Sequence, residues 1–304
     1  PEPGTAEADA PAGSRTETPA AAGTGTRTAP AAQETETPAE APAAPAPQAA
    51  ADGAQAEPAP PEADAPGPAA TRATAADDAA AKPALPLARL KARVPEGARD
   101  NVTEAYKAAG AALRKRGLTG ARADVYLVLD RSGSMRPYYK DGSAQHLAEQ
   151  ALGLAAHLDG TATVRVVFFS TDVDGTGELT PEDVEGRIDE LHDSLGRMGR
   201  TFYDRAIAEV LAQHQKTGPE RPALVLFQTD GAPEARTAAT RALADAADRP
   251  VFWQFVAFGE EDNKAFDYLR RLRADNAGFF HAGPAPRDIP HTRFYREILA
   301  SWNA

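Results

Sequence analysis

Oxygen-bearing side chains gather at the point where an apolar run of the sequence ends. The run Val125–Leu129 is followed directly by Asp130, and Ser132 and Ser134 come two and four residues later. A carboxylate and two hydroxyls that emerge together from a buried strand form an all-oxygen cluster. Oxygen ligands suit a small hard cation such as Mg²⁺ far better than a soft metal. The sequence therefore predicts a metal site at the end of this strand.

Two later segments supply groups that would complete such a site. Thr201 provides a third hydroxyl, and Asp230 provides a second carboxylate shortly after the apolar run Ala223–Phe227. In open parallel sheets, ligands gather at the carboxyl ends of the strands. We therefore expect Asp130, Thr201 and Asp230 to converge. Three neutral hydroxyls would leave the ion strongly electrophilic, with a position open for an anionic oxygen from outside.

The elements that must position these residues alternate between strand and helix. Strands are expected at 124–129, 163–170, 223–229, 251–258 and 278–281. Helices are expected at 100–118, 143–158, 180–195, 202–213, 233–247, 264–272 and 294–302. This alternation predicts an α/β fold, a doubly wound and mostly parallel sheet with helices on both faces. We also expect a turn at residues 170–175 and a helix cap at Ser143.

The first 84 residues differ in composition from the rest of the chain. They contain no Val, Ile, Leu, Met, Phe, Tyr or Trp, and they hold 15 of the 26 prolines. They carry 13 acidic and 4 basic side chains, so most of the net charge of −11 lies there. Without large apolar side chains, nothing offsets the entropy cost of ordering. We expect a disordered acidic tail over 1–84, a linker over 85–97 and one domain over 98–304.

Composition also excludes several classes of site. The chain has no cysteine, so disulfides, thiolate metal sites and cysteine nucleophiles are excluded, which fits a reducing cytosol. No stretch approaches the ~20 apolar residues of a membrane span, and no basic-then-apolar leader follows Pro1. The folded part is nearly neutral, which gives no support to nucleic-acid binding. We therefore expect a cytoplasmic protein that binds neither membrane nor nucleic acid.

The predicted ligand set resembles the metal-ion-dependent adhesion site of von Willebrand factor A domains. The pattern of that site is Asp-x-Ser-x-Ser, then Thr, then Asp, and its elements here are Asp130, Ser132, Ser134, Thr201 and Asp230. The resemblance implies that the two serines and the threonine bind Mg²⁺, or Mn²⁺, directly or through water. It implies that the two aspartates act mostly through bridging waters. A Glu or Asp from a protein partner would complete the shell.

Longer phrases are similar to the A-type domain of bacterial tellurium-resistance proteins of the TerF kind. These phrases cover 132–142, 168–175, 227–233, 252–259 and 276–283, and the resemblance extends over roughly 98–302. It implies a non-enzymatic adaptor or scaffold in a cytoplasmic stress response, with no catalytic residue and no organic cofactor. Members of that family often carry an amino-terminal calcium-binding domain. Here the low-complexity tail takes its place.

Two other functions are compatible with the same ligand set. One is a metal-dependent phosphoesterase, although a nucleophile elbow at Ser134 would need Gly where Ser132 and Arg136 stand. The other is a subunit that recruits substrate to an ATPase complex. Arg131 and Arg200 are expected to flank the ion, where they are either simply solvated, as most arginines are, or also attract a carboxylate ligand. The six histidines show no paired metal spacing, so we expect them at the surface or at helix ends.

Overall fold

The structure is a computed structural model that describes residues 82–304. The disordered tail predicted for residues 1–84 therefore lies almost wholly outside the described residues. No helix of residues 82–304 is long and apolar enough to cross a membrane.

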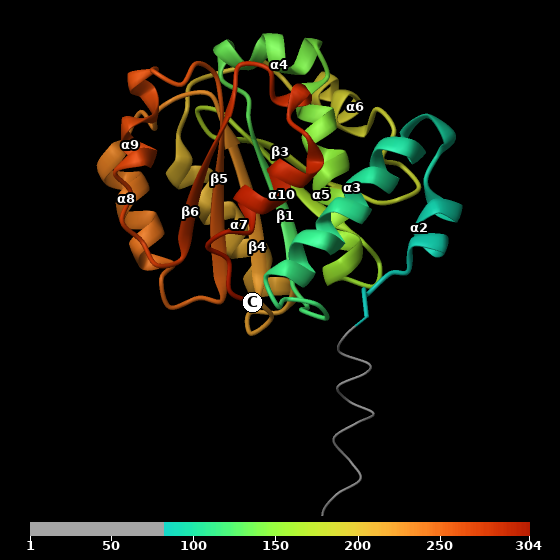
Figure 1. Cartoon of the computed structure of the whole chain (residues 1–304). Helices are drawn as coiled ribbons and strands as arrows, with labels where there is room; N and C mark the ends of the chain where they lie inside the picture. The colour runs from blue at the N-terminus through green and yellow to red at the C-terminus, as the bar shows by residue number, and fades with distance from the viewer. Residues whose placement is uncertain (1–81) are drawn as a thin grey trace, which may run out of the picture. The chain divides into compact units, whose positions relative to one another are not determined.

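Six strands form one sheet in the order β3-β2-β1-β4-β5-β6 (Figure 1). All neighbouring strands are parallel except β2 and β3, which are antiparallel. The strands are β1 (Asp124–Asp130), β2 (Val164–Phe169), β3 (Val173–Leu179), β4 (Ala223–Thr229), β5 (Val251–Phe258) and β6 (Ala277–Gly283). The predicted α/β sheet is thus confirmed.

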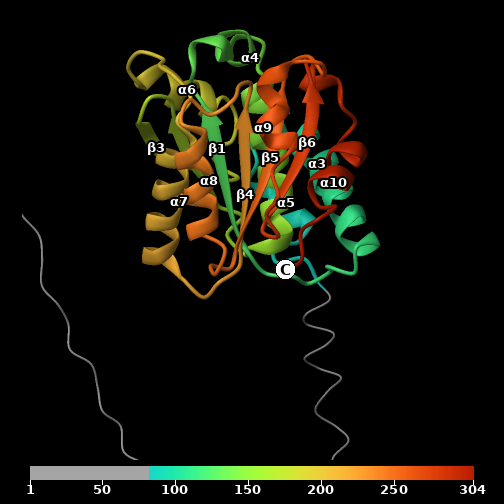
Figure 2. The same ribbon diagram turned by 90° about the vertical axis from the view of Figure 1, so that its left-hand side faces the viewer.

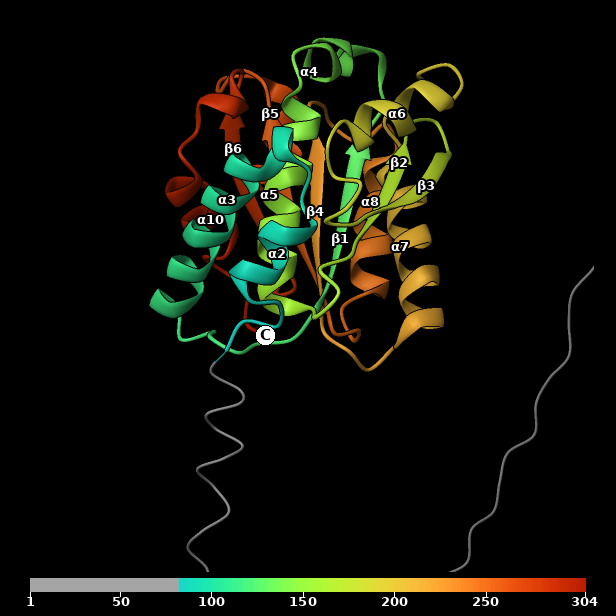
Figure 3. The same cartoon turned by 90° about the vertical axis from the view of Figure 1, so that its right-hand side faces the viewer.

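Helices cover both faces of the sheet. Figure 3 shows the face that carries α2 (Leu87–Arg93), α3 (Glu96–Lys115), α5 (Ser143–Leu158) and α10 (His291–Ile298). Figure 2 shows the opposite face, which carries α7 (Tyr203–Thr217) and α8 (Arg236–Asp245). The shorter elements are η1 (Gly133–Met135), α4 (Arg136–Lys140), α6 (Arg187–Ser194), η2 (Lys264–Phe266), α9 (Asp267–Arg270) and η3 (Pro286–Asp288).

Alternation along the central strands builds two cores. Leu127 and Leu129 of β1 lie in the core under α3 and α5, whereas Tyr126 and Val128 lie in the core under α7. Every residue of β1 is buried, as expected for a parallel strand covered on both sides. A strand buried on both faces has a fixed register, because a slip of one residue would exchange the contents of the two cores.

This register brings the ends of β1 and β4 to the same edge of the sheet. Leu129 of β1 pairs with Gln228 of β4. Asp130 therefore emerges beside Thr229, one residue before Asp230. The short helix α4 lies above this edge in Figure 3. The fold thus places two of the predicted ligands side by side.

The expected linker over 85–97 differs from the structure, because most of this segment is helical. It contains α2 and the start of α3, and its apolar side chains Leu85, Leu90 and Val94 are at most 5% exposed. The hydroxyl of Tyr106 donates to the carbonyl of Leu85 at 3.1 Å. These side chains bury against the α3 and α5 layer, so the segment belongs to the folded domain.

The turn expected at 170–175 is replaced in part by strand β3. Gly175 and Gly177 lower the intrinsic preference of this segment for a strand. They are needed because leucines of the α6 segment lie directly on them: a Cβ atom would lie 2.5 Å from Leu195 at Gly175 and 2.9 Å from Leu191 at Gly177. The strand is therefore specified by packing between segments, which its own residues do not reveal.

Two helix starts also differ from expectation. The helix expected from residue 180 begins at Arg187, because Asp183 accepts hydrogen bonds from the backbone and the hydroxyl of Thr180 at 2.6 and 3.0 Å and closes a turn. Ser143 does not cap α5. The cap position is Gly142, whose φ of 78° suits glycine, and the Ser143 hydroxyl has no partner among the described residues.

Candidate metal centre

The carboxylate of Asp130 is held in one orientation at the end of β1. Asp130 is fully buried. Its Oδ1 accepts the backbone N–H of Ser132 at 2.6 Å, and its Oδ2 accepts the hydroxyl of Thr229 at 2.7 Å. Its own carbonyl accepts the hydroxyl of Tyr139 at 2.9 Å. These bonds fix both the side chain of Asp130 and the start of the loop over residues 131–134, which we call the serine loop.

Three oxygens from two strand ends form a triangle next to this carboxylate. The hydroxyls of Ser132 and Ser134 lie 3.2 Å apart. Both donate to Oδ1 of Asp230, at 3.3 Å from Ser132 and 3.0 Å from Ser134. The structure therefore brings Asp130, Ser132, Ser134 and Asp230 into one hydrogen-bonded set, although Asp130 and Asp230 are 100 residues apart in the sequence.

Thr201 is brought close to this set by the segment that precedes it. The Gly199 segment that leads to it forms backbone hydrogen bonds with the serine loop, from Gly199 N to Arg131 O and from Gly133 N to Gly199 O, both at 3.2 Å. A Cβ atom on Gly231 would lie 3.8 Å from the Thr201 hydroxyl. No hydrogen bond joins that hydroxyl to the other four predicted ligands, all of which lie in the described part of the chain. All three loops nevertheless meet at one place.

The donor set fits a small divalent cation. A regular octahedron around Mg²⁺, with bonds of ~2.0–2.1 Å, has edges of about 2.8–3.0 Å. The triangle of Ser132, Ser134 and Asp230 oxygens has edges of 3.0–3.3 Å. A shift of a few tenths of an ångström would match one face of that octahedron. Within residues 82–304, no group of three or more His, Cys, Asp or Glu is placed to hold a metal, and this set has only two carboxylates.

Burial and repulsion shape the electrostatics of the two aspartates. Burial, together with the negative charge of Asp230, raises the pKa of Asp130 to about 7, although the bonds from Thr229 and Ser132 oppose the rise. Burial also raises the pKa of Asp230, against the bonds from Ser134 and Ser132. Two carboxylates that share a poorly solvated site repel each other, and a bound cation would offset that repulsion.

Two polar residues of β4, Gln228 and Thr229, support the site. The sequence alone did not indicate a role for either. Thr229 bonds Asp130 and in turn accepts the hydroxyl of Tyr203 at 3.3 Å. Gln228 accepts the backbone N–H of Asp130 at 3.3 Å, and its amide donates to the sulfur of Met135 at 3.1 Å. The available signal was the pair of polar residues at the end of an otherwise apolar strand, both fully buried in the structure.

Arg131 is neither solvated nor available to attract a carboxylate from outside, so both expectations for it are wrong. Its side chain is 2% exposed and forms an ion pair with Asp174 at 3.0 Å. It also bonds Nδ1 of His192 at 3.1 Å and the carbonyl of Gly196 at 2.8 Å. All three nitrogens of the Arg131 guanidinium thus have partners within the domain, and they tie β3 and α6 to the loop that carries Ser132 and Ser134. Arg200, by contrast, is exposed and lies 3.7 Å from Glu234.

A comparison with families of known proteins identifies the domain. The family model described as the vWA found in the TerF C terminus matches residues 122–304. The chain belongs to this vWA-TerF-like family. The resemblance stated from the sequence is therefore confirmed at the level of the family.

Relatives of this vWA-TerF-like chain include a curated protein of Bacillus subtilis (strain 168), "Uncharacterized protein YcbR". It is 31% identical over 200 residues, which cover 62% of this chain and 80% of the relative. Similar solved structures include a von Willebrand factor type A protein from Catenulispora acidiphila, 20% identical with a TM-score of 0.43, covering 60% of this chain and 43% of that chain. The manganese-loaded Plasmodium vivax TRAP protein is 18% identical with a TM-score of 0.39, covering 59% and 72%. This chain thus spans less than half of the first of these structures.

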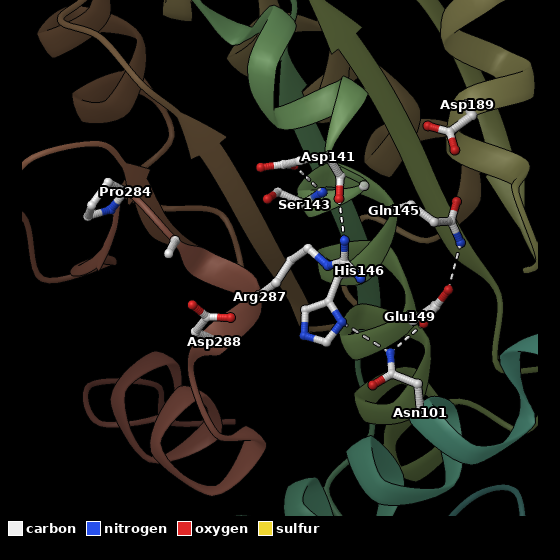
Figure 4. A pocket seen from close by; sticks show the side chains of 12 residues that line it. Asn101, Asp141, Ser143, Gln145, His146, Glu149, Asp189, Pro284, Arg287 and Asp288 are labelled. Carbon is white, nitrogen blue, oxygen red and sulfur yellow. Dashed lines mark hydrogen bonds between the residues drawn. The ribbon is translucent and has the colours of Figure 1, made fainter.

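A separate hollow lies beside the first turn of α5 in this vWA-TerF-like domain. It has a volume of about 710 Å³, and none of the five predicted metal ligands lines it. Figure 4 shows Asn101 between His146 and Glu149, with its amide nitrogen 3.2 Å from His146 Nδ1. The amide oxygen of Asn101 lies 3.0 Å from His291 Nε2. This network joins α3, α5 and α10.

The histidines have mainly structural surroundings. His157, His192 and His214 lie in the last turns of α5, α6 and α7, as the helix-end prediction states. Burial lowers the pKa of His157 and of His192. His291 begins α10 and His146 also lies at a helix end, whereas His281 lies within β6 and does not fit that prediction. His146 is half-buried in the first turn of α5, its Nε2 has no partner among the described residues, and burial, His291 and Arg287 lower its pKa to about 4.

Proposed function

We propose that this chain is a non-enzymatic, Mg²⁺-dependent protein-binding module. The observation that carries the proposal is the triangle of Ser132, Ser134 and Asp230 oxygens with edges of 3.0–3.3 Å. It lies at the carboxyl edge of the sheet, beside the buried carboxylate of Asp130. That arrangement supports a hard cation held by hydroxyls and carboxylates.

Each predicted ligand would have a distinct task. Ser132, Ser134 and Asp230 would contact Mg²⁺ or Mn²⁺ directly or through water. Asp130 would hold the serine loop in place through its bond to the Ser132 backbone, and Thr201 would offer a further hydroxyl from the neighbouring loop. A bound divalent ion with several neutral ligands keeps enough positive charge to attract an anionic oxygen. We propose that this oxygen comes from an Asp or Glu of a protein partner.

The rim around the site would select the partner. The exposed pair Arg200 and Glu234 stands on one side, at 3.7 Å from each other. Helix α4 carries Tyr138, whose ring packs on Phe258 at a centroid distance of 5.3 Å. A partner carboxylate would therefore meet charged and aromatic side chains around the ion, which favour a polypeptide surface over a free small anion.

The cellular setting that we propose is supported by the family resemblance. Membership in the vWA-TerF-like family supports a role as an adaptor or scaffold. We extend the proposal to a cytoplasmic tellurium-resistance or stress-response system, in line with the TerF resemblance. In this proposal the chain has no catalytic residue of its own.

Partner capture tests the proposal. Full-length protein and Ser134→Ala are immobilised and incubated with lysate, with excess Mg²⁺ or with EDTA, and bound proteins are quantified by mass spectrometry. Ser134 is exposed, so its removal should leave the fold intact, and Ser301→Ala is the matched control at an exposed serine. We expect partners that bind wild type and Ser301→Ala with Mg²⁺ but are lost with EDTA and with Ser134→Ala. Retention of the same partners under all conditions would contradict the proposal.

The same preparations separate the proposal from a phosphoesterase. Generic phosphate esters are supplied with Mg²⁺, and released phosphate is measured. Our account predicts no release above the background of the Ser134→Ala protein. Turnover that requires Ser134 would make the chain an enzyme and would overturn the non-enzymatic part of the proposal.

A further inference from the structure

A groove that contains none of the predicted metal ligands runs between α3 and α10. It has a volume of about 570 Å³, and the two helices are side by side in Figure 3. Its floor includes the small side chains Ala108, Ala111 and Ala112, spaced on one face of α3. Small residues on a floor allow another chain to approach closely.

All charged residues that line this groove are basic. They are Lys115 and Arg116 from the end of α3 and Arg293 and Arg296 from α10; we call the site the cationic groove. Arg296 has a partner, because it bonds Glu297 at 2.7 Å. Within residues 82–304, the other three lie beyond 4.0 Å from any carboxylate oxygen. Three of the four positive charges are thus not neutralised by this part of the chain.

Helix stability does not account for all of these charges. Lys115 lies in the last turn of α3, where the helix dipole favours a cation. Arg293 lies in the first turn of α10, which has no acidic residue. A cation there faces the positive end of the helix and is disfavoured. The helix dipole therefore does not explain Arg293, whereas Arg116 also donates to the carbonyl of Trp302 at 3.1 Å.

We infer that the cationic groove binds an acidic peptide segment of a partner protein. The occupant must be anionic, because the rim carries only basic residues. The apolar alanine floor suits the small side chains and backbone of a polypeptide. Nucleic acid requires a broad basic face, whereas this rim comprises four side chains on a chain of net charge −11. The site is independent of the metal centre, since none of the predicted ligands lines it.

Charge reversal in the full-length protein tests this inference. The variant Lys115→Glu/Arg293→Glu inverts two rim charges. The control Lys91→Glu/Arg273→Glu makes the same change in net charge at two exposed residues outside the groove. The probe is a fluorescein-labelled peptide of alanine, proline and glutamate, measured by fluorescence anisotropy in EDTA. A second peptide with glutamine in place of each glutamate is the ligand control.

We expect wild type and the control variant to bind the acidic peptide, and the groove variant to bind about tenfold more weakly or less. The glutamine peptide should not bind. Equal binding by the groove and control variants, or no binding by wild type, would overturn the inference. So would two further results: tighter binding of a DNA duplex than of the peptide, or peptide binding that appears only after the carboxylates within residues 28–71 are replaced by amides. The last would assign the groove to the chain's own acidic stretch.

Discussion

The guanidinium of Arg131, in the serine loop, and the carboxylate of Asp174 form an ion pair at 3.0 Å. The Arg131 side chain is 2% exposed and that of Asp174 is 15% exposed. Asp174 also accepts the hydroxyl of Ser170 at 2.7 Å. The pair therefore links the residue next to Asp130 with strand β3, and the position of the serine loop depends on a contact that is hidden from solvent.

Removal of one member of this pair should destabilise the fold. We expect Arg131→Met to lower the free energy of unfolding by about 3–5 kcal/mol, because it leaves the charge of the Asp174 carboxylate buried without a compensating cation. The double variant Arg131→Met/Asp174→Asn should lose less than the sum of the single variants. Urea unfolding of all three measures the coupling. As a control, Arg241→Met removes the exposed pair with Asp245 and should cost less than about 1 kcal/mol. Strict additivity would show that Arg131 and Asp174 are not coupled.

The Thr229 hydroxyl is predicted to matter for both stability and metal affinity. Thr229→Val keeps the shape of the side chain but removes the donor to buried Asp130. We expect a loss of about 1–3 kcal/mol in the free energy of unfolding, since an acceptor is left unpaired. Mg²⁺ affinity should also fall, because Asp130 loses its orientation. Thr229→Ser retains the hydroxyl and should restore affinity. If the valine variant binds Mg²⁺ as wild type does, Thr229 has no positioning role.

Close packing of α3 on α5 depends on Gly153. A Cβ atom there would lie 2.8 Å from the Ala105 Cβ and 2.9 Å from the Tyr106 backbone nitrogen. Alanine favours a helix by about 1 kcal/mol over glycine, yet overpacking costs about 1–3 kcal/mol. We therefore expect Gly153→Ala to lower the melting temperature. A higher melting temperature would show that the α3 and α5 interface yields easily.

Acid should destabilise the domain through its buried histidines. The folded-state pKa of His146 is lowered to about 4 by burial, by His291 and by Arg287, and the pKa of His291 is lowered by burial. Since the unfolded chain binds protons near pH 6.5, their stabilising contribution is complete above that pH. For His146 it is lost as the pH falls from about 6.5 to about 4.

The size of this effect can be tested at His146. We expect His146→Gln to flatten the decline of stability over that pH range by roughly 1–2 kcal/mol, after allowance for partial exposure of the ring. Urea midpoints measured between neutral pH and pH 4, with EDTA present to exclude metal effects, provide the test. An unchanged pH profile in the variant would assign the acid sensitivity to other groups.

The sequence predicts those elements whose own residues specify them. The predicted bounds of β4 and β5 agree with the structure, since both are continuous apolar runs buried on two faces. The parallel order then brings Asp130 and Asp230 to one edge, as expected. The family resemblance rests on those same residues and is confirmed by the match over residues 122–304.

Features that depend on contacts between distant segments could not be predicted in this way. Strand β3 was missed because its glycines are explained only by the leucines that pack on them. The burial of Arg131 was not predicted for the same reason, because its partner Asp174 lies on β3. The role of Thr229 likewise depends on the pairing of β1 with β4. These three missed features depend on tertiary contacts, whereas the bounds of β4 and β5 have a local signature in the sequence.

Direct titration of the metal tests the central claim most sharply. Isothermal titration calorimetry of Mg²⁺ into wild type, Ser134→Ala and the control Ser301→Ala is paired with melting temperatures across the same concentrations. We expect one ion per wild-type and control chain, and a gain of about 2.7 kcal/mol at a hundredfold excess over the dissociation constant, which corresponds to a rise of about 5–10 °C. Ser134→Ala should bind at least about tenfold more weakly. If wild type shows neither heat nor a rise in melting temperature, or if Ser134→Ala titrates as wild type does, the oxygen triangle at the end of β1 is not a metal site.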